Sequence, residues 1–194
     1  MWITKYLFQK GKIMFYKYSP FGYVDNKIFI PNIINYRNSE YQNPIHDFIL
    51  TNYCEFAICN LGGFAVLPSI LGKPNLCINS SCFGDNYYFK KTVYHPKNFI
   101  HNGIKMTIFD IMKNPIFFEQ SKKGFEVEKV SFKDISYSEL FNSVKNFLKI
   151  TKSNKFGDEH IIKRKIKKHL TPLHLLFNFS YKSLSKIYLD SQKI

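Results

Sequence analysis

One stretch constrains the fold more than any other: EFAICNLGGFAVLPSILGKPNLCIN, residues 55–79. It holds two short apolar runs, Phe56–Cys59 and Leu76–Ile78, separated by a diglycine turn and a helix-like segment over residues 63–71. Parallel strands cannot be joined by a tight turn and need a crossover of about a dozen residues or more, usually a helix. The stretch therefore predicts a parallel strand–helix–strand unit, and with it an α/β fold.

The rest of the chain supplies further strands and helices of the same kind. Extended segments are expected over residues 13–16, 28–36, 93–99 and 125–130, and helices are expected to begin at Pro44, after Thr107 and after Ser136. Asn43, Thr107 and Ser136 are helix-capping residue types, and Ser136 with Glu139 matches the S-x-x-E capping box. The fold class that we expect is therefore a Rossmann-like parallel sheet flanked by helices.

The composition changes after Lys152. The segment SNKFGDEHIIKRKIKKHL concentrates Lys and Arg at residues 163–168, and a helical pattern of apolar residues resumes beyond it. We expect a Rossmann-like domain over residues 1–152 and a basic helical C-terminal extension over residues 153–194.

The diglycine turn lies where an α/β protein binds ligands. Ligands of open parallel sheets bind beyond the carboxyl ends of the strands, and the turn Asn60–Gly63 follows a predicted strand and precedes a predicted helix. Free N–H groups and the helix dipole make such a helix start an anion site, and glycine lets the backbone approach a phosphate closely. The alternative is a tight turn whose glycines only allow the helix to pack closely on the sheet.

Several motifs occur in an order that resembles a family of bacterial glycosyltransferases of the two-domain GT-B type. The family pattern is Asp/Asn-Tyr-x-x-Ser, an aromatic-rich helix start with Asp, Cys-x-Phe-x-Ile-Gly, Ser-Gly, a short helix, Pro, and a strand ending in Asn. This chain reads NYRNS, HDFIL, YCEFAICNLGGFAVLPSILGKPNLCIN and YHPKNF, followed by MTIFDIM and GFEVEKVSFKDISYSELFNSVKNFL. The resemblance covers roughly residues 1–150 and implies the donor-binding C-terminal domain of such an enzyme.

The resemblance also implies a set of binding residues. The donor phosphates would lie at Asn60, Leu61, Gly62, Gly63 and Phe64, and the nucleotide at Tyr36, Ser39 and Asn79. Where the family has Arg-Met-Gly, this chain has Tyr16-Lys17-Tyr18, so Lys17 is a candidate phosphate contact. It would act as a point charge rather than as a bidentate fork. Independently of the resemblance, Lys97 is a second candidate phosphate contact, with a solvated surface lysine as the more common alternative.

The implied activity is transfer of a sugar from a nucleotide-sugar donor to a cell-surface glycan or a lipid-linked acceptor. The donor is a substrate, and no further cofactor is expected. By the same resemblance, the acceptor-side domain and the first strand of the donor domain are not in this sequence. Two interpretations follow: the chain is a gene fragment that is inactive on its own, or it is one half of a split enzyme whose partner is a separate polypeptide carrying the N-terminal half.

The sequence gives no clear catalytic base. Asp47 is the candidate, but it falls in the first turn of a predicted helix, where an acid simply suits the helix dipole. His46, His95 and His101 lie near predicted strand ends. His95 precedes Pro96 in an extended segment and is expected at the surface.

The formal net charge of +14 favours polyanionic partners. The basic run after residue 160 has three interpretations: a solvated helix face, adhesion to an anionic membrane surface, or nucleic-acid binding. Nucleic acid is the least favoured of these, because no DNA- or RNA-binding motif accompanies the run. A non-catalytic basic module that binds nucleic acid or an anionic membrane is nevertheless the alternative to the enzyme.

The cysteines indicate buried thiols rather than a metal site. Cys54 and Cys59, and Cys77 and Cys82, form two C-x4-C pairs, a spacing that differs from that of structural zinc sites, so no metal is expected. Cys59 and Cys77 fall in the two apolar runs, where a free cysteine acts as a small hydrophobe. No secretory signal or transmembrane run is visible. The expected location is the cytoplasm, with peripheral contact at the inner membrane.

Overall fold

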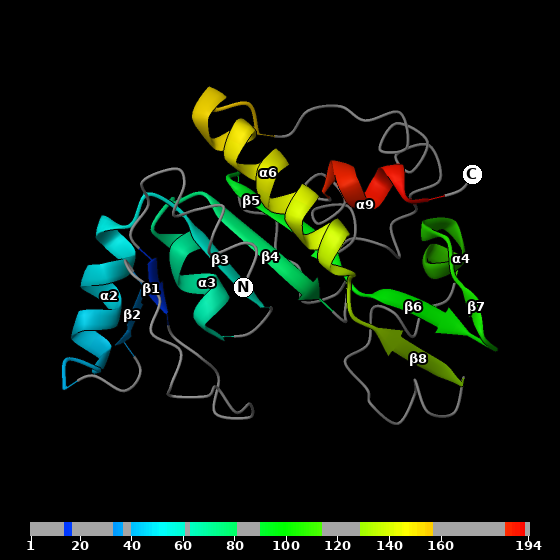
Figure 1. Cartoon of the computed structure of the whole chain (residues 1–194), viewed down its shortest axis with the longest axis horizontal. Helices are drawn as coiled ribbons and strands as arrows, with labels where there is room; N and C mark the ends of the chain where they lie inside the picture. Colours follow the sequence, from blue (N-terminus) through cyan, green and yellow to red (C-terminus); the bar gives the residue numbers. More distant parts are fainter. Residues whose placement is uncertain are drawn as a thin grey trace. The chain divides into compact units, whose positions relative to one another are not determined.

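A computed structural model describes residues 14–16, 33–36, 40–60, 63–80, 90–113, 129–156 and 185–192 (Figure 1). The chain divides into two compact units, Met1–Tyr53 and Cys54–Ile194. The predicted domain division after residue 152 falls inside the second unit, and it stays a prediction about domain organisation.

The first unit contains two short strands and a helix. Strands β1 (Met14–Tyr16) and β2 (Ile33–Asn35) pair in parallel, each within a segment predicted to be extended. Helix α2 (Pro44–Tyr53) begins at the predicted proline. The side chain of Asn43 caps it, since the His46 N–H donates to Asn43 Oδ1 at 2.9 Å.

The second unit is built around a three-stranded parallel sheet in the order β3-β4-β5. Its strands are Ala57–Asn60, Asn75–Ser80 and Thr92–Pro96. Helix α3 (Gly63–Ile70) connects β3 to β4, and Gly72 follows it with a φ of 66°, a backbone conformation that suits glycine. The predicted parallel strand–helix–strand unit is thereby confirmed, and the molecule is a mixed α/β protein.

The other elements of this unit are β6 (Asn98–His101), β7 (Ile104–Lys105), α4 (Ile108–Lys113), β8 (Val130–Lys133), α6 (Tyr137–Ser153) and α9 (Lys186–Asp190). Strands β7, β6 and β8 form a small antiparallel sheet in that order (Figure 1). The β6–β7 hairpin turns through Asn102 and Gly103, both with positive φ, as a two-residue turn of this kind requires. Of the strand predicted over 125–130, residues 125–128 lie outside the described residues; Lys129 lies in a turn with a φ of 53°, and strand β8 begins at Val130.

Helices cover both faces of the parallel sheet. Ala65 of α3 packs in the core against Cys77 and Tyr94 of the central and outer strands. Successive side chains of a strand point to opposite faces, and the next residue, His95, contacts Ser143 of α6 and Tyr188 of α9. Helix α3 therefore lies on one face and helices α6 and α9 on the other.

Helix α6 begins with the predicted capping box. The Glu139 N–H donates to Ser136 Oγ at 3.2 Å, and the Ser136 N–H donates to the Glu139 carboxylate at 2.8 Å. The helix buries Val144 and Phe147 completely and extends to Ser153.

Replacement of Ser136 by alanine is expected to lower the free energy of unfolding by about 1 kcal/mol, because the N–H groups of the first turn lose their acceptor. Urea denaturation measures this. The control is Ser138→Ala, which changes an exposed serine in the same turn and should have almost no effect. Equal losses in the two variants would contradict the capping role.

Within the parts of the chain that the structure describes, every helix is too short or too polar to traverse a bilayer.

Candidate functional site

The carboxyl edge of the parallel sheet holds the start of the predicted donor site. Asn60 ends β3 with an exposed side chain, and the backbone of Gly63 opens α3. Phe64 follows in the first turn of the same helix, whereas Leu61 and Gly62 lie outside the described residues. Two of the predicted phosphate contacts, Asn60 and Gly63, therefore lie at the strand-to-helix junction where the sequence analysis expected them.

The first turn of α3 contains no side chain that could accept a hydrogen bond from the N–H groups of its own helix. Side chains cap α2 and α6, and Thr107 with Asp110 caps α4. Helix α3 begins Gly-Phe-Ala-Val, with no acidic residue in its first turn, and the residue before it is a glycine without a side chain. Its first N–H groups, at the positive end of the helix dipole, therefore suit an external anion.

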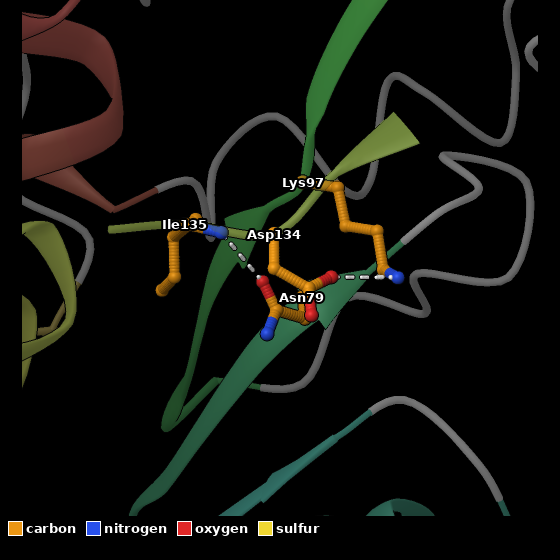
Figure 2. A network of polar contacts seen from close by, with 4 residues as sticks. All are labelled: Asn79, Lys97, Asp134 and Ile135. Carbon is orange, nitrogen blue, oxygen red and sulfur yellow. Dashed lines mark hydrogen bonds and ion pairs between the residues drawn. The ribbon is translucent and has the colours of Figure 1, made fainter. Parts of the chain in front are cut away.

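Asn79 lies in β4 next to its carboxyl end, at an irregularity in the sheet. Its φ is 54°, and the pairing of β4 with β5 shifts between Ile78 and Ser80. The bulge directs the side chain toward the β8–α6 connection, where Asn79 Oδ1 accepts a 3.0 Å hydrogen bond from the Ile135 N–H (Figure 2). This contact fixes the amide orientation, so that Nδ2 points away from Ile135 (Figure 2).

Lys97, the second candidate phosphate contact, lies close to Asn79. Its N–H donates to Ser80 O at 2.9 Å, and its Nζ forms a 2.8 Å ion pair with Asp134 (Figure 2). The Asp134 side chain is 68% exposed and that of Lys97 29% exposed, so the pair is open to solvent. The ammonium group of Lys97 is therefore already partnered by a carboxylate, and a phosphate would have to compete with Asp134 for it.

The predicted nucleotide residues of the first unit have other partners. Tyr36 is buried, and its hydroxyl donates to Tyr41 O at 3.1 Å and accepts from the Asn43 N–H at 3.2 Å. Asp47 lies in the first turn of α2, as expected. Lys17 and Ser39 lie outside the described residues, and the roles predicted for all four residues stay predictions.

His95 is not at the surface, and that prediction is wrong. All of β5 is buried, and His95 is 1% exposed because Ser143 of α6 and Tyr188 of α9 pack against it. Its Nδ1 and Ser143 Oγ form a 2.5 Å hydrogen bond, and its ring meets that of Tyr188 edge to face. Burial lowers the pKa of His95 to about 4, with the Glu139 carboxylate acting in the opposite direction. The imidazole is therefore a neutral group of the core that is closed off from solvent.

A buried polar network joins α3 to all three strands, and the sequence analysis missed it. Asn75 Nδ2 donates to Ala65 O at 2.9 Å and to Ser69 Oγ at 3.1 Å, and Asn75 Oδ1 accepts from the Cys59 thiol at 3.1 Å. Ser69 Oγ is in turn hydrogen-bonded to Thr92 Oγ1 at 2.9 Å. The feature of the sequence that could have predicted this network is the presence of polar residues inside otherwise apolar runs.

The geometry thus defines an α/β protein with two asparagines at the carboxyl edge of a parallel sheet and, beside them, a helix whose first turn contains no acidic residue. The chain matches no protein family, and no significant match was found among curated proteins or solved structures. Over the described residues, His, Cys, Asp and Glu side chains nowhere gather in a group of three or more that could hold a metal ion.

Proposed function

We propose that this chain is the donor-binding domain of a GT-B type glycosyltransferase, with a Rossmann-like fold that binds a nucleotide sugar at the carboxyl edge of the β3-β4-β5 sheet. The sugar would pass to a cell-surface glycan or a lipid-linked acceptor held by a second domain. The observation that carries the proposal is the parallel β3–α3–β4 unit, in which the first N–H groups of α3 face no side-chain acceptor from the helix itself. A diphosphate supplies the negative charge that such a helix start favours.

The two asparagines give this edge polar groups beside the anion position. Asn60 is exposed at the end of β3, and Asn79 presents Nδ2 while its oxygen is held by Ile135. An amide N–H group donates equally well to a phosphate oxygen or to a carbonyl of a nucleobase. Asn79 is therefore the proposed polar contact from the neighbouring strand.

Thermal unfolding in the presence of UDP-, GDP- and CMP-sugars tests the proposal. One nucleotide class should raise the unfolding midpoint in a concentration-dependent way, since a ligand at about 100 times its dissociation constant stabilises a protein by about 2.7 kcal/mol. The comparison samples are duplex DNA and anionic lipid vesicles. If no nucleotide sugar stabilises the chain while DNA or vesicles bind with steep salt dependence, the basic-module alternative replaces the enzyme.

Replacement of Asn79 by aspartate is expected to weaken nucleotide-sugar binding about tenfold or more, equivalent to about 1.4 kcal/mol. Aspartate keeps an acceptor for the Ile135 N–H, but it lacks the Nδ2 donor and places a negative charge beside the phosphates. Isothermal titration calorimetry measures the affinity.

The matched control for this variant is Asn102→Asp. Asn102 also has a positive φ, of 49°, but it lies in the β6–β7 turn. The Asn102→Asp substitution introduces the same charge and should leave the affinity for the nucleotide sugar unchanged. Equal affinities of the wild type and the Asn79→Asp variant would show that Asn79 is not a contact of the nucleotide sugar.

A further inference from the structure

Cys59 and Cys77 face each other across two hydrogen-bonded strands. They are register partners in the parallel β3–β4 pair, and both are free thiols packed in the core under α3. Adjacent strands lie about 4.8 Å apart, and disulfides join Cα atoms that are about 4.4–6.8 Å apart. The spacing of the two strands is therefore already that of a disulfide.

The two thiols differ in access and in acidity. Cys77 is fully buried, whereas Cys59 is partly exposed. The Cys77 thiol donates to the Cys59 sulfur and holds the pKa of Cys59 below its usual range, against the effect of burial. The same contact and burial raise the pKa of Cys77. Because the thiolate is the reactive form, Cys59 is the thiol of this pair that an oxidant attacks first.

We propose that Cys59 and Cys77 are a peroxide-sensitive pair that closes into a disulfide between β3 and β4. Hydrogen peroxide transfers an oxygen atom to the Cys59 sulfur, which gives a sulfenic acid and a molecule of water. The Cys77 sulfur then attacks the Cys59 sulfur, and the thiol proton of Cys77 leaves with the hydroxyl group as a second water. The thiols lose the two electrons that the peroxide gains.

The bond would close a loop that contains the diglycine turn and α3. A crosslink restricts the unfolded chain more than the folded one, so the oxidised protein should unfold at a higher temperature. This inference does not depend on donor binding, since it concerns only the strands that carry the turn.

The test is mass spectrometry of the full chain after exposure to hydrogen peroxide under native conditions. Remaining thiols are alkylated before digestion. The expected result is a linked peptide pair that joins Cys59 to Cys77, together with a rise of several degrees in the unfolding midpoint. Cys54 serves as the internal reference, because burial raises its pKa and it should stay alkylatable. Oxidation of Cys54 while Cys59 and Cys77 both stay reduced would overturn the proposal.

Two variants separate the chemistry from a general sensitivity to peroxide. Cys59→Ser keeps a hydroxyl that can donate to Asn75 Oδ1, and it should lose both the link and the rise in midpoint. The double variant Cys54→Ser/Cys82→Ser leaves only Cys59 and Cys77. It should keep both the link and the rise in the unfolding midpoint. A link that persists in Cys59→Ser, or one that joins Cys59 to Cys54 or Cys82 in the wild type, would contradict the assignment.

Discussion

The protein is expected to lose about 3 kcal/mol of unfolding free energy as the pH falls from about 6.5 to about 4, through protonation of His95 alone. Burial lowers the pKa of this imidazole in the folded protein to about 4, whereas an unfolded histidine titrates near pH 6.5 or so. Between these values the unfolded chain binds a proton that the folded chain does not. Acid therefore favours unfolding, and the contribution of neutral His95 is fully present only above about pH 6.5.

Urea denaturation at a series of pH values measures this effect in the wild type, His95→Gln and His101→Gln. Glutamine at position 95 can still meet Ser143 Oγ but does not titrate, so the loss over this pH range should largely disappear. His101 is exposed at the end of β6, and its replacement should leave the pH dependence intact. The same pH dependence in wild type and His95→Gln would show that His95 is not a buried neutral group.

Replacement of Asn75 by alanine is expected to cost about 3 kcal/mol of unfolding free energy, because it removes a buried hydrogen-bonding hub and leaves a cavity. The Asn75 amide is 1% exposed and joins β4 to α3 and to the Cys59 thiol of β3. Its loss leaves the Cys59 thiol without its oxygen acceptor and removes one of the hydrogen bonds of Ser69 Oγ, which keeps its bond to Thr92.

Thr92→Val is the matched control in the same network. It is nearly isosteric and removes only the 2.9 Å hydrogen bond to Ser69 Oγ, so about 1 kcal/mol is expected. Thermal and urea unfolding measure both variants. The loss of unfolding free energy in Asn75→Ala should exceed that in Thr92→Val. If it does not, the Asn75 amide does not hold α3 on the sheet.

Local signals in the sequence predicted much of the parallel sheet. The β3–α3–β4 unit follows from two short apolar runs and the helical pattern between them. The starts of α2 and α6 follow from Asn43 and Ser136, since a capping residue acts within its own first turn. These features depend on residues that are close to one another in the sequence. The order of residue types along the chain is therefore enough to predict them.

Contacts between distant residues could not be predicted in this way. His95 is buried because Ser143 and Tyr188, far along the chain, pack against it. The partner of Lys97 is Asp134, from the segment before α6. Each of these contacts depends on how α6 and α9 dock on the sheet. The periodicity of residues within one strand does not indicate how distant helices dock.

The candidate site was predicted at its strand-to-helix junction but not in its detail. Asn60 and the start of α3 follow from the order of elements. The orientation of the Asn79 amide depends on a bulge in β4 and on the Ile135 N–H, neither of which the sequence reveals. This orientation is what makes Asn79→Asp a selective test, because aspartate keeps an acceptor for the Ile135 N–H and loses only the Nδ2 donor.

The most direct test of the central claim is an NMR titration of the 15N-labelled chain with the nucleotide sugar that gives the largest thermal shift. A diphosphate at the start of α3 would receive hydrogen bonds from the first backbone N–H groups of that helix. The largest amide shifts should therefore occur at Gly63, Phe64 and Ala65, accompanied by the side-chain amide of Asn79. Shifts confined to the basic residues 163–168, with the amides of α3 unmoved at saturation, would contradict the claim.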